Sequence, residues 1–479
     1  MKKKILKVLL GFSFAGAGIF ALASCDNSSE PANTSYTVSR PTTTETTPEI
    51  SENKIENKNS TVNLGGIGLG SDKKCEVSFT FNDSYFEGQS NVYNKDLALF
   101  LYGAASVNDG KEGVSKFFTD LGFNNAITYP KTVEEYHNIS YTIAKKAAKD
   151  ATYVVVSVRG INYGQEWSSN FELGLEGDHN GFSKAADVVL EDLYTTLGNI
   201  NGDVKIALTG YSRGGAVANL LADKLFNLPE KKIADKNVYT YTFEAPKGIL
   251  VDDNRKIDYD NVFNIVNDAD IVTALAPSGY GFARCGIDIN IYNADVDNLL
   301  SKYDSELVLP KFTIIDEQYF KEETEVKDFI INKLLTDYDY DENIKINTRE
   351  KFVNNYASTI QFIFNNIVTD MKAATKEKIA DDIKTKVDAG WTGILELMSI
   401  ISDGKSLFNF LNPYFVEDGL TYDTTELQNS CNQIVGLIQG PGSFLLTFAA
   451  SEEYRNTLVR TVDMHFPIVN YVLLENHNA

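Results

Sequence analysis

Runs of consecutive apolar residues alternate with apolar residues at helical spacing along the middle of this chain. Four apolar, β-branched runs have the length of a buried strand and occupy positions 152–158, 204–209, 238–243 and 262–267. An amphipathic pattern with helical spacing begins near His179 and continues to about Leu197. Small, helix-forming residues at positions 215–222 follow the second run. These patterns predict four strands, with one helix before the second strand and one helix after it.

Helical spacing returns in the last third of the chain. A helix that Asn347 can cap is predicted up to Met371, and a second covers about residues 375–401 with an interruption at Gly390. Pro467 suits the first turn of a further helix near the C-terminus.

The N-terminus has the pattern of a secretory signal. Four lysines among the first seven residues precede an apolar stretch rich in Gly and Ala. Residues 22–25 read Leu-Ala-Ser-Cys, which resembles a bacterial lipobox, so we expect residues 1–24 to be removed and Cys25 to carry a lipid. A simple signal peptide or a short membrane anchor is the alternative. The sequence has no other stretch of 18 or more apolar residues.

Residues 25–71 are rich in Ser, Thr, Asn, Glu and Pro and have few aromatic residues. Such a composition cannot bury a core and predicts a flexible linker. With the lipobox before it, this linker would join the lipid on Cys25 to the folded part. We therefore expect the protein to be lipid-anchored to a bacterial cell membrane, on the extracytoplasmic face.

Charge and cysteine content narrow the possible functions. Loss of the signal's four lysines takes the net charge from −22 to about −26, which argues against binding nucleic acid. Cys75, Cys285 and Cys431 allow at most one disulfide. No Cys/His cluster has the spacing of metal ligands, and the acidic run 337–341 lacks the glycine and glutamate of a calcium loop. We expect neither a metal nor a cofactor.

The chemistry is concentrated at Gly-Tyr-Ser-Arg-Gly, residues 210–214, between a predicted strand and a predicted helix. A strand, G-x-S-x-G and a helix are the context of a nucleophile elbow, which holds a serine on a sharp turn. Such a turn tolerates little side-chain bulk, and the residues Gly210, Gly214 and Gly215 meet that requirement because glycine has no Cβ. A glycine-rich turn with an incidental serine is the alternative for Ser212.

An elbow serine needs oxyanion donors and an acid. The strand 152–158 ends next to Ile161, whose backbone N–H is a candidate donor together with that of Arg213. An ordinary strand end is the alternative there. Both Asp268 and Asp270 follow the fourth strand, so the residues alone leave two candidates for the acid.

Histidine is scarce, which limits the choice of base. His137 and His179 precede Ser212 in the chain, the wrong order for such a site, and His477 lies two residues from the end. His465 remains, on a predicted loop before the last helix.

Five motifs taken together carry a family resemblance. They are V-V-V-S-V-R-G, H-x-G-F, G-Y-S-R-G-G-A-V-A-N, T-F-E-A-P and N-D-A-D-I-V. Their order resembles the class 3 lipases of the α/β-hydrolase fold, continuously over about residues 121–277 and again around His465. The resemblance implies a mostly parallel central sheet with flanking helices.

The same resemblance implies site roles. Ser212 would be the nucleophile, Asp270 the acid and His465 the base, with the backbone amides of Ile161 and Arg213 as oxyanion donors and with no cofactor.

Some positions depart from the family pattern. Ile161 stands where the family has Ser or Thr, Tyr211 and Arg213 replace His and Leu, and Thr273 replaces Pro. These departures leave the triad in place and concern activity on long-chain fats more than hydrolysis itself.

The expected organisation follows from these patterns. Its parts are a signal peptide (1–24), a lipidated cysteine and linker (25–71), an α/β-hydrolase core (72–290), a mainly helical insertion acting as cap or lid (291–445) and a C-terminal core segment with His465 (446–479). The expected activity is hydrolysis of carboxylic esters, with an ester or lipid as substrate. Amide, thioester or polysaccharide acyl groups are alternative substrates, and a weakly active or inactive surface-binding lipoprotein is the alternative function.

Overall fold

The computed structural model describes residues 57–68, 71–107, 110–131, 139–160, 169–170, 172–251, 254–312, 322–328, 362, 366, 371–439 and 452–478. Its strands are β1 (Lys58–Asn63), β2 (Glu76–Phe81), β3 (Asn124–Lys131), β4 (Ile139–Ala147), β5 (Thr152–Val158), β6 (Val204–Tyr211), β7 (Val238–Phe243), β8 (Ile249–Leu250), β9 (Val262–Val266), β10 (Phe282–Ala283) and β11 (Ile287–Asn290). Its α-helices are α3 (Lys95–Ser106), α4 (Gly110–Asp120), α5 (Asn180–Gly198), α6 (Arg213–Phe226), α7 (Val296–Tyr303), α8 (Glu323–Asp328), α11 (Ala373–Asp388), α12 (Trp391–Ile400), α13 (Gly404–Asp418), α14 (Thr424–Gln439), α16 (Glu452–Asp463) and α17 (Pro467–Asn476). The short 3-10 helices are η1 (Asp83–Phe86), η3 (Asp235–Asn237), η4 (Ile271–Ala274) and η5 (Ser278–Tyr280).

A seven-stranded sheet forms the centre, with the strand order β11-β9-β7-β6-β5-β4-β3. The five strands from β11 to β5 run parallel, while β4 and β3 join antiparallel at one edge. The register places Val158 opposite Gly210, and Phe243 opposite both Tyr211 and Ile265. The carboxyl ends of four strands from distant parts of the sequence therefore meet at one edge of the sheet.

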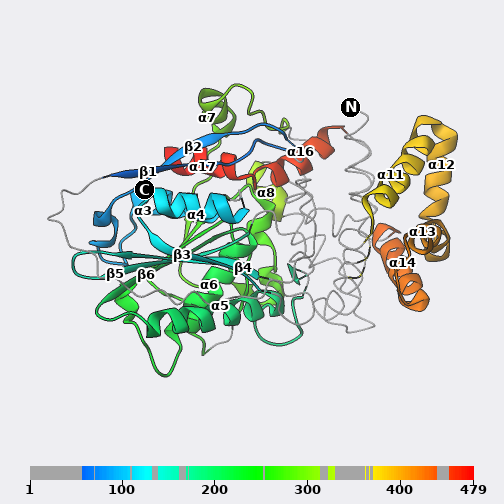
Figure 1. Ribbon diagram of the computed structural model, residues 1–479. Helices are drawn as coiled ribbons and strands as arrows, with labels where there is room; N and C mark the ends of the chain where they lie inside the picture. Colours follow the sequence, from blue (N-terminus) through cyan, green and yellow to red (C-terminus); the bar gives the residue numbers. More distant parts are fainter. Residues whose placement is uncertain are drawn as a thin grey trace.

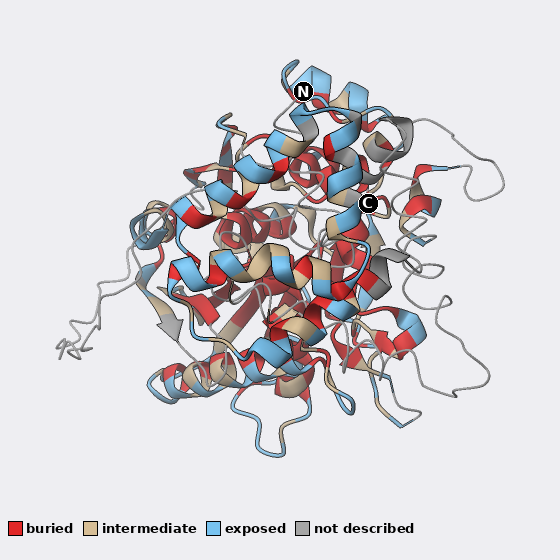
Figure 2. Ribbon diagram, turned by 90° about the vertical axis from the view of Figure 1, so that its right-hand side faces the viewer, coloured by how far each residue is buried: buried red, intermediate tan, exposed pale blue. Residues whose placement is uncertain are grey.

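Both faces of the sheet are covered, which explains why its strands are apolar without alternation. Val154, Val156 and Val158 belong to the apolar cluster beneath α5 and α6, while Tyr153 and Val155 belong to the cluster with α3, α4 and α17. Figure 1 shows these helices on the two sides of the sheet. In Figure 2 the helices carry buried residues on one side and exposed residues on the other. The predicted α/β-hydrolase architecture is confirmed.

The prediction that residues 25–71 form a flexible linker is wrong at the C-terminal end of that range. There, β1 pairs antiparallel with β2, and Val62 and Leu64 are buried in the core. Only every second residue of the later part of β1 is buried, so a strand rich in polar residues still packs one face. The glycines assigned to the linker's end begin the turn to β2, with Gly65 at φ +70°.

The core also extends beyond its predicted end at residue 290. Helix α7 packs against α17, and Val296 and Leu300 join the main apolar cluster. The predicted insertion 291–445 therefore begins with a helix that belongs to the core.

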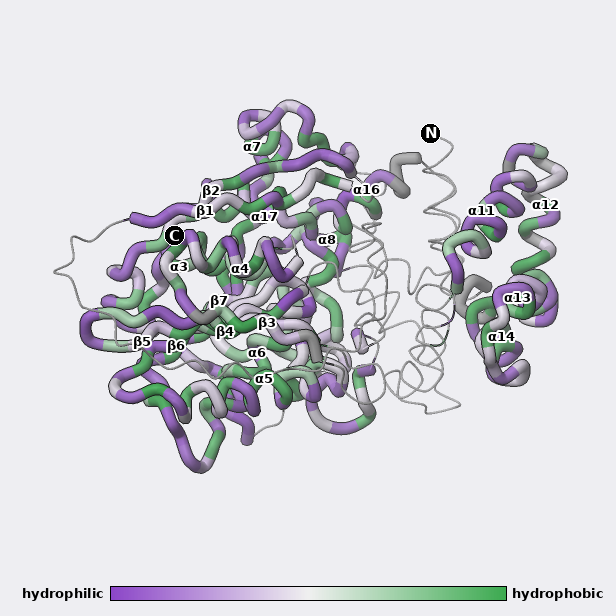
Figure 3. The backbone as a smooth tube through the Cα atoms, viewed as in Figure 1, coloured by the Kyte–Doolittle hydropathy of each residue, from purple (hydrophilic) through white to green (hydrophobic). Residues whose placement is uncertain are grey.

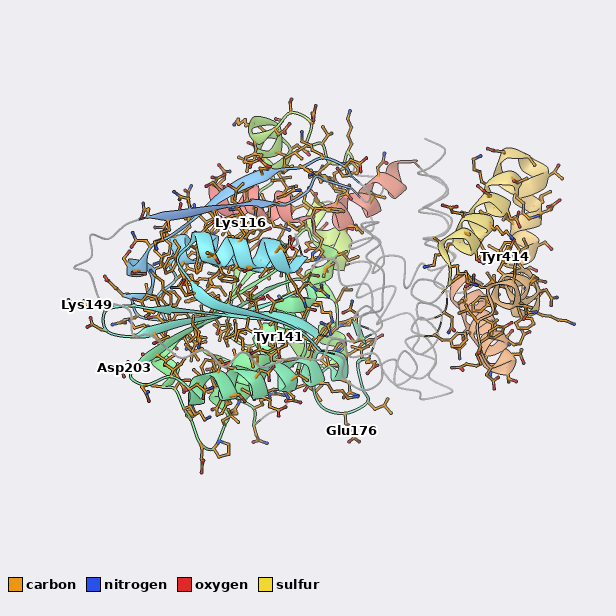
Figure 4. All side chains as sticks on the ribbon, viewed as in Figure 1. Lys116, Tyr141, Lys149, Glu176, Asp203 and Tyr414 are labelled. Atoms are coloured by element: carbon orange, nitrogen blue, oxygen red, sulfur yellow. The ribbon has the colours of Figure 1, made fainter. Side chains whose placement is uncertain are left out.

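A separate group of helices, α11–α14, lies to one side of the sheet (Figure 1). These helices pack on one another around buried residues that include Leu407, Phe415 and Leu427. Hydrophobic residues on them are visible in Figure 3, and Tyr414, labelled in Figure 4, donates a hydrogen bond to Asp382 of α11. The helical pattern predicted for residues 375–401 is confirmed as α11 and α12, separated at Gly390 (φ +70°). Of the helix predicted from residue 347 to Met371, only Phe362, Asn366 and Met371 are among the described residues, and the acidic run 337–341 lies outside them.

Two further expectations can be compared with the described part of the chain, and a third lies outside it. Cys75, Cys285 and Cys431 are all buried and all free, so no disulfide forms among them. None of the described helices is both long and apolar enough to cross a bilayer. The signal segment and Cys25 lie outside the described residues.

Candidate active site

Ser212 occupies the sharp turn between β6 and α6, as the strand, turn and helix pattern predicts. Its backbone has φ 54° and ψ −127°, a conformation that residues with a Cβ rarely adopt. A Cβ at Gly210 would lie 2.2 Å from the Gly214 carbonyl oxygen, and one at Gly214 would lie 2.2 Å from that of Val158. The glycines are therefore required by close backbone contacts around the elbow, and the turn projects Ser212 at the carboxyl edge of the sheet.

The structure brings Ser212, His465 and Asp270 together in one hydrogen-bonded chain. The Ser212 Oγ lies 2.8 Å from His465 Nε2, and His465 Nδ1 lies 2.5 Å from Asp270 Oδ2. The exposed fractions are 7% for Ser212, 4% for His465 and 0% for Asp270. With the proton on Nδ1, Nε2 is free to accept the serine proton, which is what a general base needs.

Asp270, and not Asp268, faces the imidazole. The Asp270 side chain caps η4, where its Oδ1 accepts the Val272 N–H at 2.8 Å. The Asp268 side chain is 44% exposed and pairs with Lys327 at 3.1 Å. The tertiary structure therefore separates two carboxylates that the residues alone left equivalent, and it places at the imidazole the one that the family resemblance implied.

The other histidines do not reach this site in the described structure. His179 precedes α5, stacks on Phe182 and lies 3.1 Å from the Asn170 carbonyl oxygen. His477 ends α17 and its carbonyl accepts from Lys95. His137 lies outside the described residues.

A buried polar network that the sequence analysis missed holds the loop of His465. The Tyr211 hydroxyl donates to the His465 carbonyl oxygen at 2.6 Å, and Asn470 Nδ2 donates to the Tyr211 oxygen at 2.9 Å. Asn267 Nδ2 in turn donates to Asn470 Oδ1 at 3.0 Å. Tyr211 was visible in the sequence only as a departure beside the nucleophile, and nothing local indicated Asn470.

The predicted oxyanion residues are only partly described. Ile161 lies outside the described residues, but the preceding Gly160 packs against the elbow, where a Cβ would lie 1.6 Å from the Tyr211 carbonyl oxygen. Arg213 begins α6, and its buried side chain donates to Ser169 Oγ at 3.1 Å from Nε and 2.9 Å from Nη2. The donor roles of the Ile161 and Arg213 amides stay predictions.

No group of His, Cys, Asp or Glu within the described ranges is arranged to hold a metal ion. The buried site combines a serine hydroxyl, an imidazole and a carboxylate.

Comparisons with known proteins cover part of the chain. Residues 155–280 match the family Lipase (class 3). Those residues form a class 3 lipase-like segment of an α/β-hydrolase fold. No curated protein matches the chain.

Three of the solved structures with some similarity are lipases. The triacylglyceride lipase of Rhizomucor miehei is 23% identical, with 35% of this chain and 66% of that chain covered and a TM-score of 0.28. Lipase II from Rhizopus niveus is 17% identical, with 40% and 76% covered and a TM-score of 0.30. A lipase from Rhizopus microsporus var. chinensis is 18% identical, with 36% and 63% covered and a TM-score of 0.28. The chain thus spans slightly less than two thirds of the Rhizomucor miehei lipase.

Proposed function

We propose that this protein is a membrane-anchored serine hydrolase that cleaves carboxylic esters through Ser212, His465 and Asp270. One observation carries the proposal: the elbow serine lies 2.8 Å from an imidazole that lies 2.5 Å from a buried carboxylate. Serine, imidazole and carboxylate in this order form the arrangement that activates a hydroxyl for acyl transfer. The class 3 lipase match of residues 155–280 supports an ester or lipid as substrate.

The proposed reaction has two halves. Ser212 Oγ attacks the ester carbonyl carbon while His465 Nε2 takes the serine proton and Asp270 stabilises the resulting imidazolium. The tetrahedral oxyanion would be held by the backbone amides of Ile161 and Arg213. His465 then returns the proton to the leaving alcohol, and the C–O bond to that alcohol breaks. In the second half, His465 takes a proton from water, and the resulting hydroxide attacks the acyl carbon. The bond between that carbon and Ser212 Oγ then breaks, the acid leaves, and His465 returns the proton to Ser212.

The proposed location rests on the N-terminal pattern. Lipid attached to Cys25 would hold the hydrolase at the extracytoplasmic face of a bacterial membrane, through the part of the predicted linker that precedes β1. We further propose that the helices inserted between Asp270 and His465 act as a cap or lid beside the site, because α8 and α16 both pack against η4, the short helix that Asp270 caps.

Labelling with a fluorophosphonate probe tests the proposed activity. The probe forms a covalent bond only with an activated serine, so we expect wild-type protein to be labelled at Ser212 and Ser212→Ala to remain unlabelled. Ser169→Ala is a matched control, because Ser169 is also buried but contacts Arg213 and not the imidazole. Absence of labelling in folded wild-type protein, or labelling that persists in Ser212→Ala, would contradict the proposal.

A further inference from the structure

A second buried carboxyl group lies beside the triad and has no part in the reaction above. Glu244 directly follows β7 and has an exposed fraction of 0%. Its backbone has φ +48°, a left-handed conformation that is unfavourable for any residue with a Cβ. The fold therefore holds a buried carboxyl side chain, on a strained backbone, at the carboxyl edge of the sheet.

The two carboxyl oxygens of Glu244 have different hydrogen-bond partners. Its backbone N–H donates to the Ile265 carbonyl at 2.9 Å, and its Oε2 accepts the Asn267 N–H at 2.9 Å. Its Oε1 is fully buried and receives no hydrogen bond from an N–H or hydroxyl group of any described residue. The carboxyl of Asp270 is a second neighbour within hydrogen-bonding contact of the Glu244 carboxyl. Glu244 Oε2 binds the N–H of Asn267, and the Asn267 carbonyl accepts the Asp270 N–H at 2.9 Å, so the Glu244 side chain lies against the turn that carries Asp270.

Two carboxyl groups in contact inside a protein cannot both be ionised at low cost, so they share a proton. Asp270 already accepts two donors, the Val272 N–H at 2.8 Å and His465 Nδ1 at 2.5 Å. Glu244 accepts one, from Asn267. Hydrogen bonds to the ionised form favour that form, so the charge belongs on Asp270 and the proton on Glu244.

The other titratable groups around Glu244 do not reverse this assignment. Burial, and then the charge of Asp270, raise the pKa of Glu244 well above its usual range, whereas the Asn267 N–H and the Arg284 guanidinium act in the opposite direction. Among the described residues, the phenols of Tyr102 on α3 and Tyr211 on β6 also lie near Glu244, and burial raises the pKa of both well above the usual range. Both phenols therefore stay neutral and add no charge.

We propose that Glu244 is a positioning residue that donates its carboxyl proton in a hydrogen bond to Asp270 and thereby fixes the carboxylate that orients His465. The proposal rests on the function proposed above. Throughout the reaction the proton stays on Glu244, so a single negative charge lies behind the imidazole. The triad is thus extended by a neutral fourth member.

Infrared spectroscopy of the full protein tests the protonation directly, without reference to activity. A neutral carboxylic acid has a C=O stretch that is separate from the bands of carboxylates. We expect wild-type protein at pH 8 to show this band, shifted by ¹³C-glutamate labelling, and Glu244→Gln to lack it. Absence of the band in wild-type protein would overturn the proposal, and so would its persistence in Glu244→Gln.

Two substitutions of similar size test the positioning role. Glu244→Gln keeps a neutral donor for Asp270 and an acceptor for Asn267, so kcat and the acid limb of the pH profile of kcat/KM should stay within about threefold of wild type. Glu244→Met removes the donor and should lower kcat about 10–100-fold with little change in KM, as expected for a lost hydrogen bond to a charged group. Asp268→Asn is the control for removal of a nearby carboxylate, because Asp268 pairs with Lys327 instead.

The outcomes separate the possible roles. If Glu244 were ionised, Glu244→Gln would remove a negative charge near the imidazole and move the acid limb to lower pH by about one unit or more, which would overturn the proposal. Equal activity loss in Glu244→Gln and Glu244→Met, or full activity in Glu244→Met, would also overturn it. If wild-type protein shows the infrared band but hydrolyses no ester, the proposed function fails while the protonation of Glu244 stands.

Discussion

The Tyr211 hydroxyl donates a 2.6 Å hydrogen bond to the carbonyl oxygen of His465. The residue that precedes Ser212 in the elbow therefore supports the loop that carries His465, although Tyr211 and His465 are 254 positions apart. Local geometry at Ser212 and the position of the imidazole are coupled through one side chain.

Tyr211→Phe should lower kcat about tenfold and destabilise the protein by about 1–3 kcal/mol, because the His465 carbonyl and the Asn470 amide each lose a buried partner. Ester-hydrolysis kinetics and thermal unfolding measure the two effects. Tyr239→Phe is the matched control, since its buried hydroxyl contacts the Gly88 carbonyl at 2.7 Å at the other end of β7. Because Tyr239 lies near the amino end of β7, away from the triad, Tyr239→Phe should lower the stability of the protein but leave kcat unchanged. Equal kcat values for the two variants would contradict a role of Tyr211 at His465.

Asp270→Asn should reduce kcat about 10⁴-fold, because an asparagine no longer favours the imidazole tautomer with a proton on Nδ1. Asp268→Asn should leave kcat within about twofold, since its carboxylate pairs with Lys327 and Asn290 at the surface. Initial rates on a soluble p-nitrophenyl ester compare the two. A larger loss in Asp268→Asn would show that Asp270 is not the acid.

Arg460→Met should destabilise the protein by about 3–5 kcal/mol, because it leaves the buried Glu323 carboxylate without its partner. Arg460 Nε lies 2.5 Å from Glu323 Oε1, and the guanidinium also donates to Asp297 at 2.9 Å. The pair joins α8 to α16, the described helices on either side of residues 329–451.

Denaturant unfolding measures this loss of stability. Lys378→Ala removes an exposed ion pair with Glu417 and should cost less than about 1 kcal/mol. Similar losses in Arg460→Met and Lys378→Ala would mean that the buried pair contributes no more than a surface pair.

Cys25→Ala should prevent lipid attachment and release the protein from membranes into the soluble fraction. Radiolabelled palmitate and membrane fractionation measure these effects, with Cys75→Ala as the control because that cysteine is buried in the fold. Palmitate label that remains in Cys25→Ala, or is lost in Cys75→Ala, would argue against lipidation at Cys25.

Several elements followed from the sequence because their signals are local. The buried strands, the glycines of the elbow and the helix after Ser212 depend on residues within a few positions of one another. His465 followed from the small number of histidines and their order. In contrast, the composition of residues 58–63 predicts part of a flexible linker, whereas these residues form β1. A strand with only one packed face needs few apolar residues, so its composition resembles that of a polar linker.

The sequence by itself determined the nucleophile turn, the alternation of strands and helices, and which histidine could serve Ser212. The family resemblance implied Asp270, but only the tertiary structure shows that this aspartate faces the histidine and that Tyr211, Asn470 and Glu244 lie around the triad. The physical reason is the distance along the chain: Asp270 and His465 are 195 positions apart, and Tyr211 and Asn470 are 259 apart. Periodicity and turn chemistry act over a few residues, whereas the direction of a buried polar side chain is set by the packing of helices and strands that meet only in the folded protein.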